Sequence, residues 1–149
     1  MLSRRRLQRL LRIYPPFLGA GIRIKRMSDD LREIDVEMRL HWWNANYVGT
    51  HYGGSLYSMT DPFYMLMLIA NLGGEYIVWD KAASIRFRKP GKGTVEAQFR
   101  LAQSQLDAMR AQLQTHDKIE PAFLVQIRDA QGEVVAEVEK RLQIRRKTT

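Results

Sequence analysis

The sequence lacks cysteine and long apolar runs, and each absence excludes a class of protein. Without Cys among the 149 residues, there is no disulfide framework, thiolate nucleophile or cysteine-ligated metal site. The strongly apolar stretch over residues 62–72 is much shorter than the roughly 20 residues of a membrane-spanning helix. Arg9 and Arg12 interrupt the apolar stretch that a secretion signal needs. We therefore expect a cytoplasmic protein without a transmembrane segment.

Acidic residues are missing from the first 26 positions, which carry eight basic ones. The rest of the chain holds as many basic as acidic residues, 16 of each, so the net charge of +8 belongs to the N-terminal arm. A neutral body argues against a nucleic-acid-binding domain. A basic arm on a neutral body is instead typical of an attachment or a lid.

Within the arm, apolar residues follow helical spacing and predict a basic amphipathic helix over residues 1–20. The stripe consists of Leu7, Leu10, Leu11 and Tyr14, and Pro15-Pro16 is expected to end the helix. In one interpretation the leucines dock this helix on a single domain over residues 21–149. In the other, the arginines bind anionic lipid as a peripheral membrane contact. The pattern leaves both open.

The body of the chain alternates apolar and polar residues with period two, which predicts half-buried strands. Five strands are expected, and the late ones are joined by short turns, so they are antiparallel. Their apolar rows lie within residues 34–40, 83–88, 95–101, 123–127 and 134–144, and a short helix is expected over 104–115. No internal repeat or linker indicates a second domain.

The stretch after Gly53-Gly54 predicts a different element, a helix buried on most sides. It has no wide polar face, because Met, Leu, Phe, Tyr and Ile fill residues 63–69. Several antiparallel strands together with one buried helix imply a sheet that curls around the helix. The expected helix starts near Ser55 and runs through Pro62 with a kink there.

The start of this helix is the strongest candidate for a catalytic site. Two glycines allow a ligand to approach the unpaired N–H groups of the first turn, which stabilise a developing oxyanion. Asp61 follows Gly54 by seven residues, close to two helical turns, so both are expected on one face. A carboxylate above an oxyanion site is suited to acid–base or nucleophilic chemistry.

Each of these residues also has a structural interpretation. Asp61 before Pro62 is typical of an N-cap with proline at the first helical position, in which case the helix begins at Pro62. His51 fits a loop anchor, and Asn46 fits a residue that holds a turn through its side chain. Metal binding is not expected, because the histidines are scattered: His41, His51 and His116.

The same segment resembles the motif of PaaI-type acyl-CoA thioesterases, which have the hotdog fold. Six positions match that motif in identity and spacing: Asn46, Gly49, Thr50, Gly53, Gly54 and Asp61. Residues 81–90 resemble the long strand that follows the central helix in that superfamily. Residues 14–21 and 76–81 resemble an uncharacterised bacterial branch known as a domain of unknown function. One departure is that Tyr52 stands where the motif has histidine, and His51 precedes it.

The resemblance implies an α+β hotdog fold with an antiparallel sheet of five to six strands wrapped around one long central helix. It also implies a homodimer or homotetramer whose site lies between protomers. The implied activity is hydrolysis of an acyl-CoA or acyl-carrier thioester, without a cofactor.

In this implied reaction, Asp61 attacks the thioester carbonyl or deprotonates a water that does. Asn46 would place the water or the carbonyl, and an N–H at Gly54 would polarise the carbonyl. Substrate contacts would come from Gly53, His51, Tyr52, Arg86, Arg88 and Lys89; the basic ones, with Lys92, also fit solvated surface. The alternative function is a non-catalytic hotdog module that binds an acyl chain or a lipid surface, with the methionine-rich helix as its pocket wall.

Overall fold

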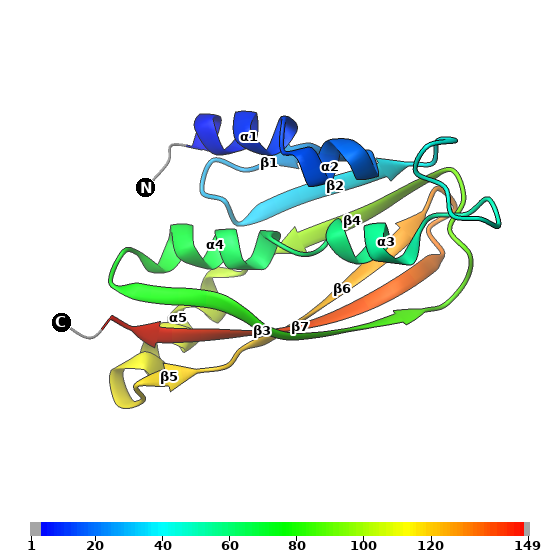
Figure 1. Ribbon diagram of the computed structural model, residues 1–149. Coiled ribbons are helices and arrows are strands. Elements are labelled where there is room, and N and C mark those ends of the chain that lie inside the picture. The colour runs from blue at the N-terminus through cyan, green and yellow to red at the C-terminus, as the bar shows by residue number, and fades with distance from the viewer. Residues whose placement is uncertain (1–3, 148–149) are drawn as a thin grey trace.

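The protein is described here by a computed structural model of residues 4–147, which form one sheet packed against helices (Figure 1). In chain order the helices are α1 (Arg4–Arg12), α2 (Pro15–Ala20), α3 (Gly53–Ser58), α4 (Phe63–Leu72) and α5 (Gln103–Thr115). The strands are β1 (Ile22–Met27), β2 (Glu33–Arg39), β3 (Tyr76–Phe87), β4 (Thr94–Arg100), β5 (Lys118–Ile119), β6 (Ala122–Asp129) and β7 (Val134–Arg146). Over these residues, no helix is long and apolar enough to cross a membrane.

The sheet is antiparallel throughout, and this confirms the predicted α+β class. Its strand order is β1-β2-β4-β6-β7-β3, with β5 paired to β7. Within residues 4–147 it has seven strands rather than the expected five to six, because β1 and the two-residue β5 join the others. Figure 1 shows α3 and α4 end to end, with β1 and β2 on one side of them and β3 and β7 on the other.

The expected central helix consists of two successive helices separated by a turn at residues 59–62. Helix α3 begins at Gly53, near the predicted start, but ends at Ser58, and α4 begins at Phe63. The last turn of α3 tightens, because the N–H of Thr60 bonds to the carbonyl of Tyr57. Pro62 has no N–H to continue the helical ladder. The predicted kink is therefore a full break.

Aromatic packing around α4 fixes this break over the sheet. The Phe63 side chain is fully buried, and its ring centroid lies 5.8 Å from that of Phe17 and 4.8 Å from that of Phe99. The Tyr64 ring stacks on Phe123 at 4.1 Å. Because these partners come from α2, β4 and β6, the helix is tied to elements distant in sequence.

The N-terminal arm forms two helices, and its prolines begin the second one. Helix α1 ends at Arg12, and the Pro15-Pro16 pair occupies the first turn of α2, where a missing N–H costs little. Leu7 and Leu11 are partly buried against the core, whereas Leu10 and Tyr14 are largely exposed. Residues 1–3 of the predicted arm helix lie outside the described residues.

Strand β3 lies at an edge of the sheet, and the inner face of its second half is exposed. Among the strands of residues 4–147 it pairs only with β7, and its ladder shifts register between Asp80 and Ala82. After this bulge, Ala83, Ile85 and Phe87 lie opposite inward-facing residues of β7, as the sequence predicts. Ala83 and Phe87 are nevertheless exposed. This part of the inner face therefore lacks a cover within residues 4–147.

Candidate functional site

A groove lies at the start of α3, where the sequence places the two glycines. It has a volume of about 420 Å³ and is lined by residues that include Asn46, His51, Gly53, Leu56 and Phe87. The Phe87 ring lies so close that a Cβ on Gly53 would be 3.0 Å from its Cζ atom. Glycine therefore lets the aromatic ring approach the first turn of the helix.

The amide groups at this helix start are free to meet a ligand. Tyr52 precedes α3 and makes no side-chain capping hydrogen bond. Among the hydrogen bonds of residues 4–147, none has the N–H of Gly53 or Gly54 as its donor. The unpaired N–H of Gly53, which lines the groove, is able to polarise a carbonyl oxygen held there.

Asn46 holds the loop that leads into the groove. Its Oδ1 accepts hydrogen bonds from the N–H groups of Val48 and Thr50, at 3.1 and 3.0 Å. Its Nδ2 donates to the Thr50 hydroxyl and to the His51 carbonyl, at 2.9 and 3.3 Å. All four hydrogen-bonding positions of the amide are thus used by the turn, which favours the turn-holding interpretation of Asn46.

His51 anchors the same loop to the connection between β3 and β4. Its side chain is 3% exposed, its Nε2 lies 2.9 Å from the Gly93 carbonyl, and its backbone N–H bonds to the Gly91 carbonyl. Burial lowers the pKa of His51 below 6.5, and the hydrogen bond to Gly93 opposes that change. The ring is therefore neutral near neutral pH and donates through Nε2.

Gly54 and Tyr52 border a separate cavity on another side of α3. This cavity has a volume of about 450 Å³ and is also lined by Trp43, Ser55 and Ser58. The Tyr52 side chain is exposed, and its Cε1 atom would lie 2.6 Å from a Cβ on Gly54. The two glycines thus open onto different cavities, one beside Phe87 and one beside Tyr52.

Asp61 lies in the turn between α3 and α4, and it caps neither helix. Its side chain is 50% exposed, and Pro62 rather than Asp61 occupies the N-cap position of α4. Its Oδ1 accepts a hydrogen bond from the Tyr57 hydroxyl at 3.0 Å and lies 3.4 Å from Nζ of Lys140. Neither cavity beside the glycines is lined by Asp61. The expected single face with Gly54 and Asp61 is therefore not formed by one chain.

Three residues around Asp61 were not among the candidates from the sequence. Lys140 of β7 is fully buried, and its Nζ lies 3.1 Å from Oδ1 of Asp80. Burial raises the pKa of Asp80, and the Lys140 ammonium opposes that rise. Burial, with the hydrogen bond to Asp61, raises the pKa of Tyr57 to about 12. Tyr57 therefore remains a protonated hydrogen-bond donor.

Four basic residues on β3 and in the loop after it were predicted to contact the substrate, and they differ in whether they form ion pairs within the protein. Arg88 pairs with Glu137 at 2.9 Å, and Lys89 pairs with Asp129 at 2.7 Å and with Glu133. Arg86 and Lys92 are exposed and form no ion pair within the described part of the chain. Of these four residues, Arg86 and Lys92 are therefore the two more available to an anionic ligand.

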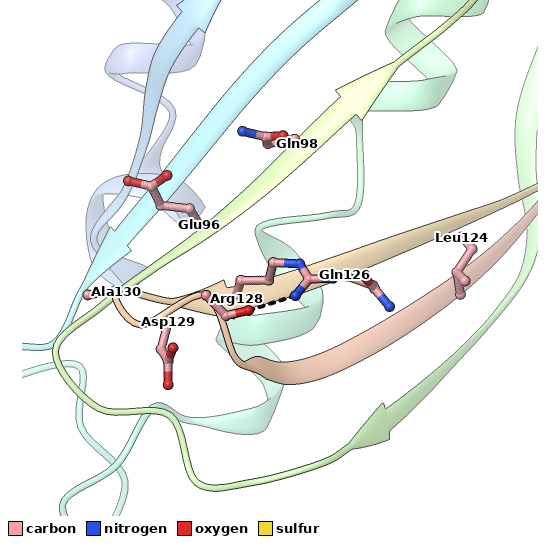
Figure 2. A pocket seen from close by; sticks show the side chains of 8 residues that line it. Glu96, Gln98, Leu124, Gln126, Arg128, Asp129 and Ala130 are labelled. Atoms are coloured by element: carbon pink, nitrogen blue, oxygen red, sulfur yellow. Dashed lines mark hydrogen bonds between the residues drawn. The ribbon is translucent and has the colours of Figure 1, made fainter.

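A further cavity lies on the outer face of the sheet, away from this site. Figure 2 shows its side chains along β4 and β6, including Glu96, Gln98, Leu124 and Gln126; its volume is about 620 Å³. The two strands pair over only three positions, from Val95 to Ala97 on β4. Asp61 and Lys140 lie on the opposite, inner face. Across residues 4–147, no group of three or more His, Asp or Glu side chains is arranged to hold a metal ion.

An antiparallel sheet wrapped around a bent central helical segment, with Gly53-Gly54 at its start and Asp61 at its break, defines a hotdog-fold protein. Residues 3–144 match the family described as "Domain of unknown function (DUF4442)", and the chain belongs to that family. No curated protein sequence matches it significantly.

Solved structures of similar fold include several thioesterases. A protein from Pseudomonas aeruginosa described as "Probable Thioesterase" is similar with a TM-score of 0.86 and 23% identity, over 98% of this chain and 97% of that one. A protein of unknown function from Chlorobaculum tepidum gives a TM-score of 0.74 at 13% identity, with 96% and 94% covered. A thioesterase from Haemophilus influenzae gives 0.70 at 14% identity, with 98% and 92% covered. At such identities the likeness establishes the fold.

Proposed function

We propose that this protein hydrolyses the thioester of an acyl-CoA or an acyl-carrier protein, with Asp61 as the base or nucleophile. The observation that carries the proposal is the position of the Asp61 carboxylate and its contacts. The carboxylate is half-exposed, fixed through Oδ1 by Tyr57 and Lys140, and set at the break of the central helical segment. The thioesterases among the structures of similar fold support the same reaction class.

The proposed reaction consumes one water and releases a carboxylic acid and a thiol. As a base, Asp61 takes a proton from water while the water oxygen attacks the thioester carbonyl carbon. The N–H groups of Gly53 or Gly54 stabilise the oxyanion that forms. When it collapses, the carbon–sulfur bond breaks, the thiolate leaves, and the proton passes from Asp61 to the thiolate. In the nucleophilic route Asp61 attacks the carbonyl carbon directly, and the carbon–sulfur bond breaks as the thiolate leaves. Water then hydrolyses the acyl-aspartyl anhydride, which releases the carboxylic acid and the Asp61 carboxylate, and a proton from the water passes to the thiolate.

The placement of Asp61 relative to the glycines favours a site shared by two protomers. Asp61 lies beyond the end of α3, and neither cavity beside the glycines is lined by it, so we infer that it does not act on a carbonyl held at Gly53 in the same chain. We propose a homodimer in which Asp61 of one protomer faces the glycines of the other. The unpaired edge of β3 and the exposed Ala83 and Phe87 side chains support an interface along this strand.

Ala83→Lys tests this interface, because a lysine on an open strand edge opposes pairing with a second copy. Sedimentation velocity of the wild type should show a dimer, and the variant should shift to monomer with an unchanged circular dichroism spectrum. Ala130→Lys is the matched control, because Ala130 is exposed at the turn between β6 and β7. A wild-type monomer at all concentrations would contradict the shared site.

Turnover of an acyl-CoA panel tests the proposed function itself. The panel should vary the acyl group from short to long chains and to aromatic acids, and thiol release should be followed with a thiol reagent. Phe87 and Leu56 line the groove, so an apolar acyl group is expected to be preferred. Exposed Arg86 and Lys92 are proposed contacts for the CoA phosphates. Binding of acyl-CoA without thiol release would favour the non-catalytic acyl-binding module.

A further inference from the structure

Lys140 is a buried cation in an otherwise apolar row on the inner face of β7. Its neighbours in this row, Val138 and Leu142, are fully buried, as is Lys140 itself. A lysine is almost never fully buried unless it is paired, because an ammonium group taken out of water loses its hydration. The role of Lys140 therefore depends on which groups lie close to its Nζ.

Three elements bring partners to the Lys140 ammonium group. From the turn after α3, Asp61 offers both its carboxylate and its backbone carbonyl to Nζ. From β3, Asp80 places Oδ1 at 3.1 Å. From α3, the Tyr57 ring centroid lies 5.7 Å from Nζ, within the range of a cation–π contact. One ammonium group thus joins the helix break to two strands.

The sequence creates this meeting point through two backbone irregularities. The helix breaks before Pro62, so the Asp61 carbonyl is available to Lys140. On β3 the ladder shifts register immediately after Asp80, and such a bulge redirects the adjacent side chains. Asp80 pairs with Leu142 in the ladder, two positions from Lys140 on the same face, so its carboxylate reaches Nζ diagonally.

The partners of Asp61 all act on the same oxygen atom. Tyr57 donates to Oδ1, and Lys140 lies nearest to Oδ1. Among the interactions of residues 4–147, no hydrogen bond or ion pair uses Oδ2. One oxygen of the carboxylate is therefore fixed, and the other remains for a proton or a carbonyl carbon.

We propose that Lys140 and Tyr57 are positioning residues for the thioesterase reaction: they hold Asp61 through Oδ1 so that Oδ2 acts on the water or the substrate. Asp80 completes the arrangement as the second carboxylate partner of Lys140. This inference rests on the proposed function. It goes further by assigning distinct roles to the two oxygens of Asp61 and by giving the buried lysine a task in the reaction.

The competing interpretation is that Lys140 only stabilises the turn at the helix break. Replacing a buried ion pair with an apolar side chain is often neutral or stabilising, whereas removing one partner leaves an unpaired charge. Both interpretations therefore allow a change in stability when Lys140 is replaced. They differ in the rate per folded molecule and in whether a conservative replacement of Lys140 restores that rate.

Four variants separate the two interpretations. Lys140→Met keeps a straight side chain and removes the charge, and Lys140→Arg keeps the charge. Tyr57→Phe removes one hydroxyl and leaves the ring, so it remains informative even where Lys140→Met fails to fold. Arg141→Met is the matched control, because Arg141 is the exposed neighbour on β7 and its loss changes the net charge equally.

We expect Lys140→Met to lower kcat on the order of 10–100-fold with little change in KM, since misplacing a catalytic group by about 1 Å has effects of this size. Tyr57→Phe should lower kcat by about 10-fold, because it removes a hydrogen bond to a charged group. Lys140→Arg should recover part of the loss, and Arg141→Met should behave as wild type.

Unchanged kcat in folded Lys140→Met and Tyr57→Phe would overturn the inference while wild-type turnover upholds the proposed function. Failure of the wild type to hydrolyse any thioester would overturn the proposed function and, with it, the role of both residues.

Discussion

Protonation of His51 is expected to weaken the fold as the pH falls. Because burial lowers the folded-state pKa of His51 below 6.5, the unfolded chain takes up a proton before the folded chain does. The stabilisation from the neutral ring is therefore full above pH 6.5 and is lost as the pH falls through the folded-state value. A difference of one bound proton gives a slope of at most about 1.4 kcal/mol per pH unit.

The location of His51 explains why the loss should be measurable. Its Nδ1 is buried without a hydrogen-bond partner among residues 4–147, so a proton there would be unpaired. The groove beside it is also lined by the cations Arg88 and Lys89. Protonation would thus place an unpaired N–H and a positive charge in a buried position, and the hydrogen bond to Gly93 offsets only part of that cost.

Urea unfolding of the wild type and His51→Gln, from about pH 8 to about pH 5, measures this contribution. Glutamine keeps an N–H donor and removes the titrating ring, so the stability difference between the two proteins should shrink below pH 6.5. His116→Gln is the control, because His116 is exposed at the end of α5. Parallel pH curves for the wild type and His51→Gln would refute the argument from burial.

Two further predictions concern the packing of the helices. Deletion of residues 1–13 should lower the free energy of unfolding by about 1–3 kcal/mol, because the partly buried Leu7 and Leu11 lose their contacts with the core. Binding to anionic vesicles should not change; strong, salt-sensitive binding that disappears with the deletion would support a lipid-binding arm instead. Phe63→Ala should cost about 3–5 kcal/mol in urea unfolding. Phe63→Leu should cost much less, and equal costs would contradict the ring packing with Phe17 and Phe99.

The fold was largely predictable because most strands and the central helical segment have strong hydrophobic patterns. The period-two rows of β2, β4, β6 and β7 face the core as expected, and α5 covers the predicted 104–115. Strand β1 was missed, since its ladder shifts register between Ile24 and Arg26 and the shift breaks the alternation. Strand β5 has two residues, too few for any periodicity.

The candidate site was predictable only where it depends on local sequence. The sequence predicted a helix start near Ser55, and the observed start is Gly53. It also singled out Asp61 before Pro62, but both interpretations of Asp61 assumed local contacts. Its actual partner, Lys140, is 79 residues away in the chain. A signal was present in the last strand, because a lysine occupies an inward position between Val138 and Leu142. Asp80 gave no such signal, because the bulge after it cannot be read from the alternation.

The turnover of Asp61→Asn on a thioester that the wild type hydrolyses tests the account most directly. Asparagine keeps the shape of the side chain and removes the charge, so kcat should fall on the order of 10²–10⁴-fold while KM changes little. Asp117→Asn is the matched control, because Asp117 is exposed after α5. A folded Asp61→Asn protein with a much reduced kcat is the result we predict. Wild-type turnover by Asp61→Asn would contradict a base or nucleophile at this position.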